Sequence, residues 1–99
     1  MATESTLQAA FCKLARSNGI LVYKFASPSQ RGVPDLMCIY DGFVCFVEMK
    51  SPNKTGRLTQ MQLYQIEQIE DHGVNCFVSD SKESNEGIVE LILLVTHPE

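Results

Sequence analysis

The spacing of apolar residues predicts a helix near the start of the chain. Between Thr3 and Gly19, apolar side chains recur every three or four residues and would share one face of a helix: Leu7, Ala10, Phe11, Leu14 and Ala15. Thr3 or Ser5 can cap the start of this helix, and Gly19 can end it. Residues 20–26 are rich in β-branched and aromatic types, so we expect a strand there.

A loop, a hairpin and two further strands follow. Residues 27–34 contain two prolines and a glycine and are predicted to form a loop. Residues 35–40 and 43–49 have the composition of strands, and the dipeptide Asp41-Gly42 between them is typical of a two-residue hairpin turn. These two strands are therefore predicted to be antiparallel neighbours.

The second half of the chain predicts a helix, a strand and a helix. The first of these helices is expected from Leu58 or Thr59 to His72, and its expected apolar stripe comprises Met61, Leu63 or Tyr64, Ile66 and Ile69. Residues 74–79 form the fourth predicted strand, and the last helix is opened by residues 81–86. A strand–helix–strand step favours parallel pairing. We therefore expect one α/β domain over residues 1–99, with a mixed sheet flanked by helices and a C-terminal helix.

Composition and charge exclude several functional classes. No apolar run approaches the ~20 residues that span a bilayer, and the first residues lack the pattern of a signal peptide. We therefore expect an intracellular, cytoplasmic protein without a membrane partner. Four cysteines lie among apolar neighbours without C-x-x-C spacing, which favours core thiols over a zinc site. The net charge of −4 argues against a generic nucleic-acid coat, but not against carboxylates that hold divalent cations.

Three polar residues converge at the predicted hairpin. Glu48 and Lys50 are two positions apart on one strand, so their side chains project from the same face. The hairpin brings Asp35, which follows Pro34, opposite about residue 48. Two adjacent carboxylates repel each other unless a cation lies between them, and such oxygen ligands suit Mg²⁺ or Mn²⁺. Each residue alone has an ordinary explanation, as a turn residue or a solvated strand face, but their convergence favours a phosphodiester-cleaving site.

These residues resemble the motif of a nuclease superfamily. Pro34-Asp35, twelve intervening residues and Glu48-Met49-Lys50 resemble the PD-(D/E)xK motif. The element order resembles the αβββαβ core of restriction-endonuclease-like proteins. More narrowly, the chain resembles the VRR-NUC family, and within it the short stand-alone members associated with bacteriophages. The similar stretches are YKF (23–25), SP (27–28), RGVPDL (31–36), FVEMK (46–50) and LTxxQ (58–62), and the resemblance covers about residues 4–80.

The resemblance implies a metal site and a role for each matching position. Asp35 and Glu48 would be metal ligands, joined by the backbone carbonyl of Met49. Glu4 matches an acidic position that supports the metal site or a second ion. The reaction implied by the resemblance is metal-assisted hydrolysis that leaves a 5′-phosphate and a 3′-hydroxyl, with no small-molecule cofactor.

Two further catalytic positions follow from the resemblance. Lys50 would orient or activate the attacking water and offset the charge that builds on the phosphate. Gln62 matches a glutamine that lies close to the site at the start of the helix after the motif.

Four cations and one glutamine flank the predicted site on both sides. Lys24, Gln30 and Arg31 lie around the loop before the motif aspartate, and Lys54 and Arg57 lie in the loop after the motif lysine. All five could contact DNA phosphates. Scattered solubilising charge explains Lys54 equally well.

The expected assembly and substrate are inferred from the last predicted helix. Its body, residues 87–95, is apolar on almost all sides, which one small domain cannot easily cover. It is either buried within the monomer or the interface of a two-fold homodimer, and we favour the homodimer. Two facing sites would suit branched DNA such as a four-way (Holliday) junction, a selectivity associated with stand-alone members of the family.

The leading hypothesis is therefore an Mg²⁺- or Mn²⁺-dependent DNA endonuclease. One alternative is a nuclease for flap or linear DNA, and another is a catalytically silent nucleic-acid-binding module. A third is an interaction protein whose motif is accidental. The intact Asp35, Glu48 and Lys50 argue against a silent module.

Overall fold

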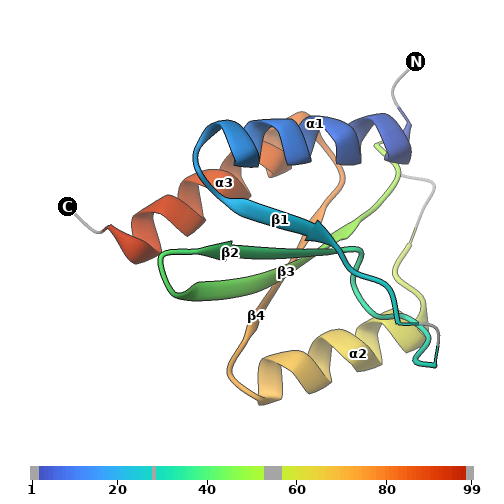
Figure 1. Cartoon of the computed structure of the whole chain (residues 1–99). Helices are drawn as coiled ribbons and strands as arrows, with labels where there is room; N and C mark the ends of the chain where they lie inside the picture. Colours follow the sequence, from blue (N-terminus) through green and yellow to red (C-terminus); the bar gives the residue numbers. More distant parts are fainter. Residues whose placement is uncertain (1–2, 28, 53–56, 98–99) are drawn as a thin grey trace.

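A computed structural model of the chain describes residues 3–27, 29–52 and 57–97, and it shows a four-stranded mixed sheet between helices (Figure 1). The elements are, in order, α1 (Glu4–Ser17), β1 (Leu21–Lys24), β2 (Leu36–Tyr40), β3 (Phe43–Met49), α2 (Gln60–Asp71), β4 (Asn75–Ser79) and α3 (Lys82–Thr96). The predicted α/β fold, with its restriction-endonuclease-like αβββαβ core and C-terminal helix, is confirmed.

The hairpin between β2 and β3 sets the register of the sheet. Asp41 and Gly42 both have positive φ, at 51° and 86°, which matches the twist that two-residue hairpin turns require. The antiparallel register pairs Leu36 with Val47, so Asp35 falls next to Glu48 just beyond the paired residues. β4 joins the other side of β3 in parallel, and the strand order is β1-β2-β3-β4. Both predicted pairings are confirmed.

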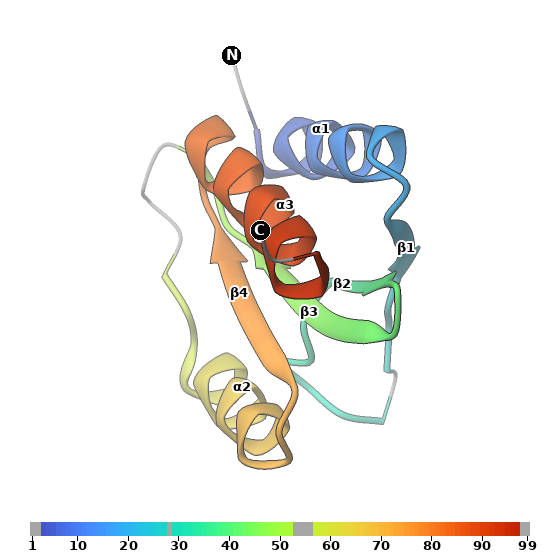
Figure 2. The same ribbon diagram turned by 90° about the vertical axis from the view of Figure 1, so that its left-hand side faces the viewer.

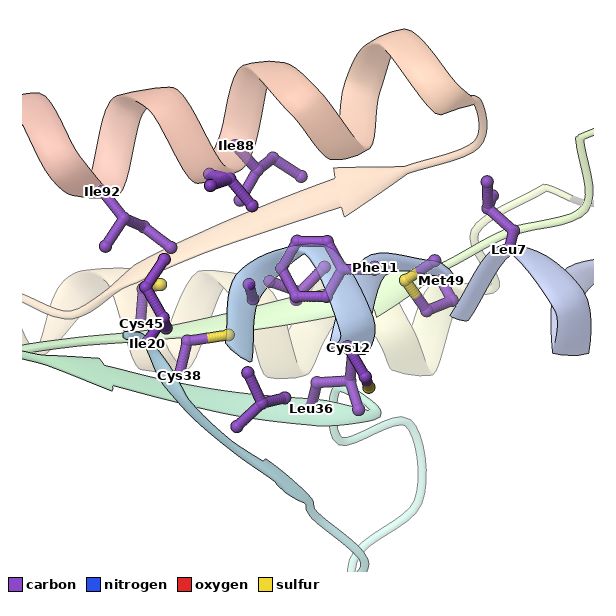
Figure 3. Close-up of a cluster of buried hydrophobic side chains, with 14 residues drawn as sticks. Leu7, Phe11, Cys12, Ile20, Leu36, Cys38, Cys45, Met49, Ile88 and Ile92 are labelled. Atoms are coloured by element: carbon purple, nitrogen blue, oxygen red, sulfur yellow. The ribbon is translucent and has the colours of Figure 1, made fainter. Parts of the chain in front are cut away.

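The hydrophobic core lies between one face of the sheet and the helices α1 and α3 (Figures 2 and 3). Alternate β3 residues, Cys45, Val47 and Met49, point into this core and are fully buried. Asn85 joins the layers, because its side chain accepts a hydrogen bond from Ser79 Oγ and donates one to the Leu7 carbonyl. The cysteines are free thiols, three buried and one half-buried, as the sequence predicts. Ala10 is exposed and lies outside the core, contrary to expectation.

The opposite face of the sheet is only partly covered. α2 packs on β4, at one edge, so Leu21, Tyr23 and Val44 toward the other edge are 36–54% exposed. The predicted apolar stripe of α2 is wrong for three of its members: Met61, Leu63 and Tyr64 are exposed, whereas Ile66 and Ile69 are half-buried. A helix that lies at a sheet edge buries a narrow seam, and its remaining apolar residues stay in solvent.

α3 is buried on one side only. Ile88, Val89 and Ile92 enter the core, while a stripe on the outer side remains 42–53% exposed and comprises Leu91, Leu94 and Val95. The helix is therefore not buried on all sides within one chain. None of the helices in the described part of the chain combines the length and the hydropathy needed to cross a membrane.

Candidate active site

Asp35 and Glu48 meet at one end of the sheet, as the hairpin predicts. Asp35 immediately precedes β2, and its Oδ2 accepts a hydrogen bond of 2.9 Å from the backbone N–H of Met49 in β3. Glu48 is only 3% exposed although its side chain lies on the sheet face away from the main core. The register of one hairpin therefore holds two carboxyl groups side by side.

Burial and charge raise the pKa of Glu48 to about 7 from an ordinary value of 4.5. Burial is the largest cause, and the neighbouring charge of Asp35 acts in the same direction. The Lys50 ammonium and a hydrogen bond from the Asp35 backbone act in the opposite direction but do not outweigh them. A cation placed against this pair would stabilise the ionised form of both groups.

Lys50 lies beside the carboxylates, on the side that strand periodicity predicts. Its Nζ is 3.9 Å from Glu48 Oε2, and its side chain is 14% exposed. The backbone N–H of Lys50 donates a 2.9 Å hydrogen bond to the Ser79 carbonyl, which fixes the end of the motif strand against β4. The Lys50 ammonium therefore lies beside the acid pair.

Gln62 connects α2 to the acid pair. Its Nε2 donates a 2.7 Å hydrogen bond to Glu48 Oε2, and its Oε1 accepts a 2.8 Å bond from the backbone N–H of Thr59. Thr59 caps α2, since its side chain accepts a bond from the Gln62 backbone in return. The part that Thr59 plays was not predicted from the sequence, although the T-x-x-Q spacing of a capping box was the signal.

Gly32 fastens the loop before Asp35 to the same helix. It has a φ of +80°, and a Cβ atom built on it would lie 2.6–2.8 Å from backbone atoms of Met61 and Gln62. Only a residue without a side chain allows this approach. Gly32 was not singled out from the sequence, and the available signal was its place in the RGVPD stretch.

Glu4 lies near the acid pair without completing a cluster of ligands. It is exposed on the first turn of α1, and its charge is one of the causes that raise the pKa of Glu48. The part of the chain that the structure describes contains no group of three or more His, Cys, Asp or Glu residues able to hold a metal ion.

The candidate DNA-binding residues lie in different places. Gln30 and Arg31 are exposed in the loop before Asp35, and Arg57 is exposed shortly before α2. Lys24 shares the sheet face of the buried Val22, so it lies on the α1 side rather than on the Glu48 side. Lys54 lies outside the described residues.

The donor atoms present fit a hard divalent cation. Two carboxyl groups at the end of a strand, one of them nearly buried, match the one or two carboxylates with which proteins usually bind Mg²⁺, the remaining positions being taken by water and phosphate. Asp35 and Glu48 would hold such an ion, with the Met49 carbonyl at the end of β3 as a further oxygen donor.

Comparison with known proteins relates the chain to nucleases. It is 33% identical to a protein of Acyrthosiphon pisum secondary endosymbiont phage 1 named "Putative nuclease p44", over 81 residues that make up 81% of this chain and 85% of that protein. No model of a protein family matches the sequence. A solved structure described as a VRR_NUC domain is similar over 99% of this chain and 100% of its own, with a TM-score of 0.77 and 26% identity. The chain therefore belongs to the VRR-NUC family of nucleases.

Proposed function

We propose that this nuclease is a metal-dependent DNA endonuclease that leaves 5′-phosphate and 3′-hydroxyl ends. The observation that carries the proposal is the juxtaposition of Asp35, the nearly buried Glu48 and Lys50 at one end of the sheet. An acid pair next to an ammonium matches what phosphodiester hydrolysis requires, namely a cation site and a positive charge near the phosphate. Residues 1–99 act as one domain in this proposal, in the cytoplasm, or that of the host if a phage encodes the chain.

Each proposed catalytic residue has a distinct task. Bound Mg²⁺ or Mn²⁺ would lower the pKa of a bound water and neutralise charge on the phosphate. Asp35 and Glu48 would hold that ion together with the Met49 carbonyl, and Glu4 would support it from α1. Lys50 places a compact positive charge where negative charge develops on the phosphate.

Gln62 keeps the Glu48 carboxylate in one orientation. Its amide is fixed by the cap of α2, so the hydrogen bond to Oε2 leaves that oxygen little freedom. Arg31 and Arg57, exposed on the segments before β2 and before α2, are proposed to bind DNA phosphates on either side of the scissile bond. No small-molecule cofactor enters this scheme.

We further propose that two copies act together on branched DNA, of which a four-way junction is the prime example. The support is the outer stripe of α3, where Leu91, Leu94 and Val95 recur at helical spacing and are all exposed. A two-fold dimer buries the same stripe of both copies against each other and holds two sites in fixed relation. A four-way junction offers two strands to be cut in such a symmetric arrangement.

Cleavage of labelled linear, flap and four-way DNA tests the proposal. We expect cutting with Mg²⁺ or Mn²⁺ and none with a chelator. Glu48→Ala and Lys50→Ala should each lower the rate by at least about a hundred-fold, the usual cost of losing a metal ligand or a transition-state charge. Glu67→Ala, which removes an exposed acid of α2, is the matched control and should cut at the normal rate.

Three results would contradict the proposal in different ways. Binding without cutting would show a silent nucleic-acid-binding module. Cutting that persists in chelator would show that cleavage does not require a metal ion. A preference for flap or linear DNA over the junction would leave the nuclease in place and replace its proposed substrate.

A further inference from the structure

A second candidate binding surface lies on the α1 side of the sheet. A cavity of about 570 Å³ opens between α1 and the end of β1, and we name it the α1–β1 groove. Three cations line it, Lys13, Arg16 and Lys24, together with the polar side chains of Ser5 and Gln8. No acidic side chain of the described residues is among those that line it. None of the residues proposed for catalysis contributes to this groove.

We propose that the α1–β1 groove binds the sugar–phosphate backbone of the DNA substrate, away from the cutting site. The inference rests on the proposed function, because it names where a second stretch of the same DNA lies. Charge complementarity supports it first. The chain has 8 cationic and 12 acidic residues and a net charge of −4, yet three of its cations meet in one groove without an acid. Such a groove attracts a polyanion to a protein that otherwise repels it.

The groove is held in shape before any ligand arrives. Arg16 Nη2 donates a 2.8 Å hydrogen bond to the Val22 carbonyl, which fixes the guanidinium and leaves its other N–H groups for a phosphate. Burial raises the pKa of the Cys12 thiol, but the charges of Arg16 and Lys24 both act to lower it. Both cations are therefore close to Cys12, one of the residues that line the groove.

The position of the groove fits a DNA strand that continues from the cutting site. Ser5 follows Glu4, whose charge reaches Glu48, and Arg16 lies in the last turn of the same helix. Ser5 and Arg16 are eleven positions apart along the helix, or roughly 16 Å. One strand of duplex DNA has a phosphate about every 3.4 Å along its axis, so several successive phosphates match this length. β1 is an edge strand, which leaves the groove open to a long polymer.

The test replaces Lys13 and Lys24 by glutamine, singly and together. Both side chains are exposed, so the variants should melt at the temperature of the unmodified protein. Affinity for a labelled four-way junction is measured in chelator at several salt concentrations. Lys13→Arg with Lys24→Arg keeps both charges and is the matched control. Asn75→Asp is a second control at the opposite edge of the sheet. It makes the net charge more negative by one, which is also the charge change in each single lysine variant.

We expect the slope of log affinity against log salt to flatten by about one for each lysine removed. For the double variant this corresponds to about a hundred-fold weaker binding at 0.1 M salt, if the lines meet at 1 M. The arginine pair and Asn75→Asp should bind like the unmodified protein. Normal affinity and slope in the double glutamine variant, with metal-dependent cutting intact, would show that the groove does not bind DNA and would leave the proposed function unaffected. A protein that neither binds nor cuts DNA would overturn the proposed function, and the groove with it.

Discussion

The pKa of Glu48 predicts how the stability of the metal-free protein depends on pH. The folded protein holds a proton on Glu48 up to about pH 7, whereas the unfolded chain loses it near 4.5. Stability should therefore fall as pH rises from about 4.5 to about 7, by at most roughly 3 kcal/mol, and the contribution is fully present below that window. Urea unfolding at pH 5 and pH 8 measures the difference.

Glu48→Gln and added Mg²⁺ are the controls for this prediction. The Gln variant cannot ionise at this position, so its stability should change less between the two pH values. Mg²⁺ should stabilise the unmodified protein at pH 8 far more than at pH 5, because it binds the ionised pair. An identical pH dependence in both proteins would show that burial of Glu48 carries no such energetic cost.

Gln62 acts on the reaction through Glu48, so its loss should lower activity more than stability. Gln62→Ala removes the 2.7 Å bond to Glu48 Oε2 and is expected to weaken metal affinity or activity by about ten- to a hundred-fold, as other groups that orient a ligand do. Gln65→Ala, at a half-buried position on the same helix, is the matched control. A titration of cleavage rate against Mn²⁺ distinguishes weaker metal affinity from a lower rate at saturating metal. Equal titration curves for both variants would remove Gln62 from the site.

At the level of elements, the contact between Gly32 and α2 couples the Asp35 loop to the helix that carries Gln62. Gly32→Ala should be destabilising twice over, through its positive φ and through contact with the α2 backbone at 2.6–2.8 Å. Gly42→Ala supplies the control, since Gly42 has a similar φ of +86° and a Cβ atom there would meet nothing within 4 Å. We expect a loss of about 1 kcal/mol for Gly42→Ala, and a larger loss with reduced cleavage for Gly32→Ala. Equal melting temperatures would show that the loop and the helix are not coupled.

Elements with strong local signals could be predicted from the sequence, and contacts between distant elements could not. The dipeptide Asp41-Gly42 fixes a turn by its own backbone preferences, and that turn places Asp35 next to Glu48. The approach of Gly32 to α2 depends instead on how a loop and a helix pack, which no periodicity encodes. For the same reason the predicted stripe on α2 was wrong at Met61 and its neighbours. The side of the sheet on which Lys24 lies could have been predicted, because strand alternation places it with Val22.

At the scale of the whole molecule, charge is divided between two regions. The acid pair lies at one end of the sheet beside Lys50, and three cations of α1 and β1 line the α1–β1 groove. A net charge of −4 therefore coexists with a proposed path for DNA. The divalent ion proposed for the acid pair would further reduce the negative charge that the substrate meets, so affinity for DNA should increase with metal even where cutting is blocked.

The outer surface of the molecule predicts how two copies meet. The exposed apolar regions of the described residues include the outer stripe of α3 with Leu94, the uncovered sheet face with Val44, and the outer side of α2 with Met61, Leu63 and Tyr64. The stripe on α3 lies on a single helix and can pack against its own copy about a two-fold axis. We therefore expect Leu94→Glu to convert a dimer to a monomer, with Val44→Glu remaining dimeric, as measured by sedimentation equilibrium. Paired cuts in a four-way junction should become single cuts in Leu94→Glu, while cutting of linear DNA continues. A monomeric unmodified protein, or dissociation by Val44→Glu in place of Leu94→Glu, would contradict the proposed interface.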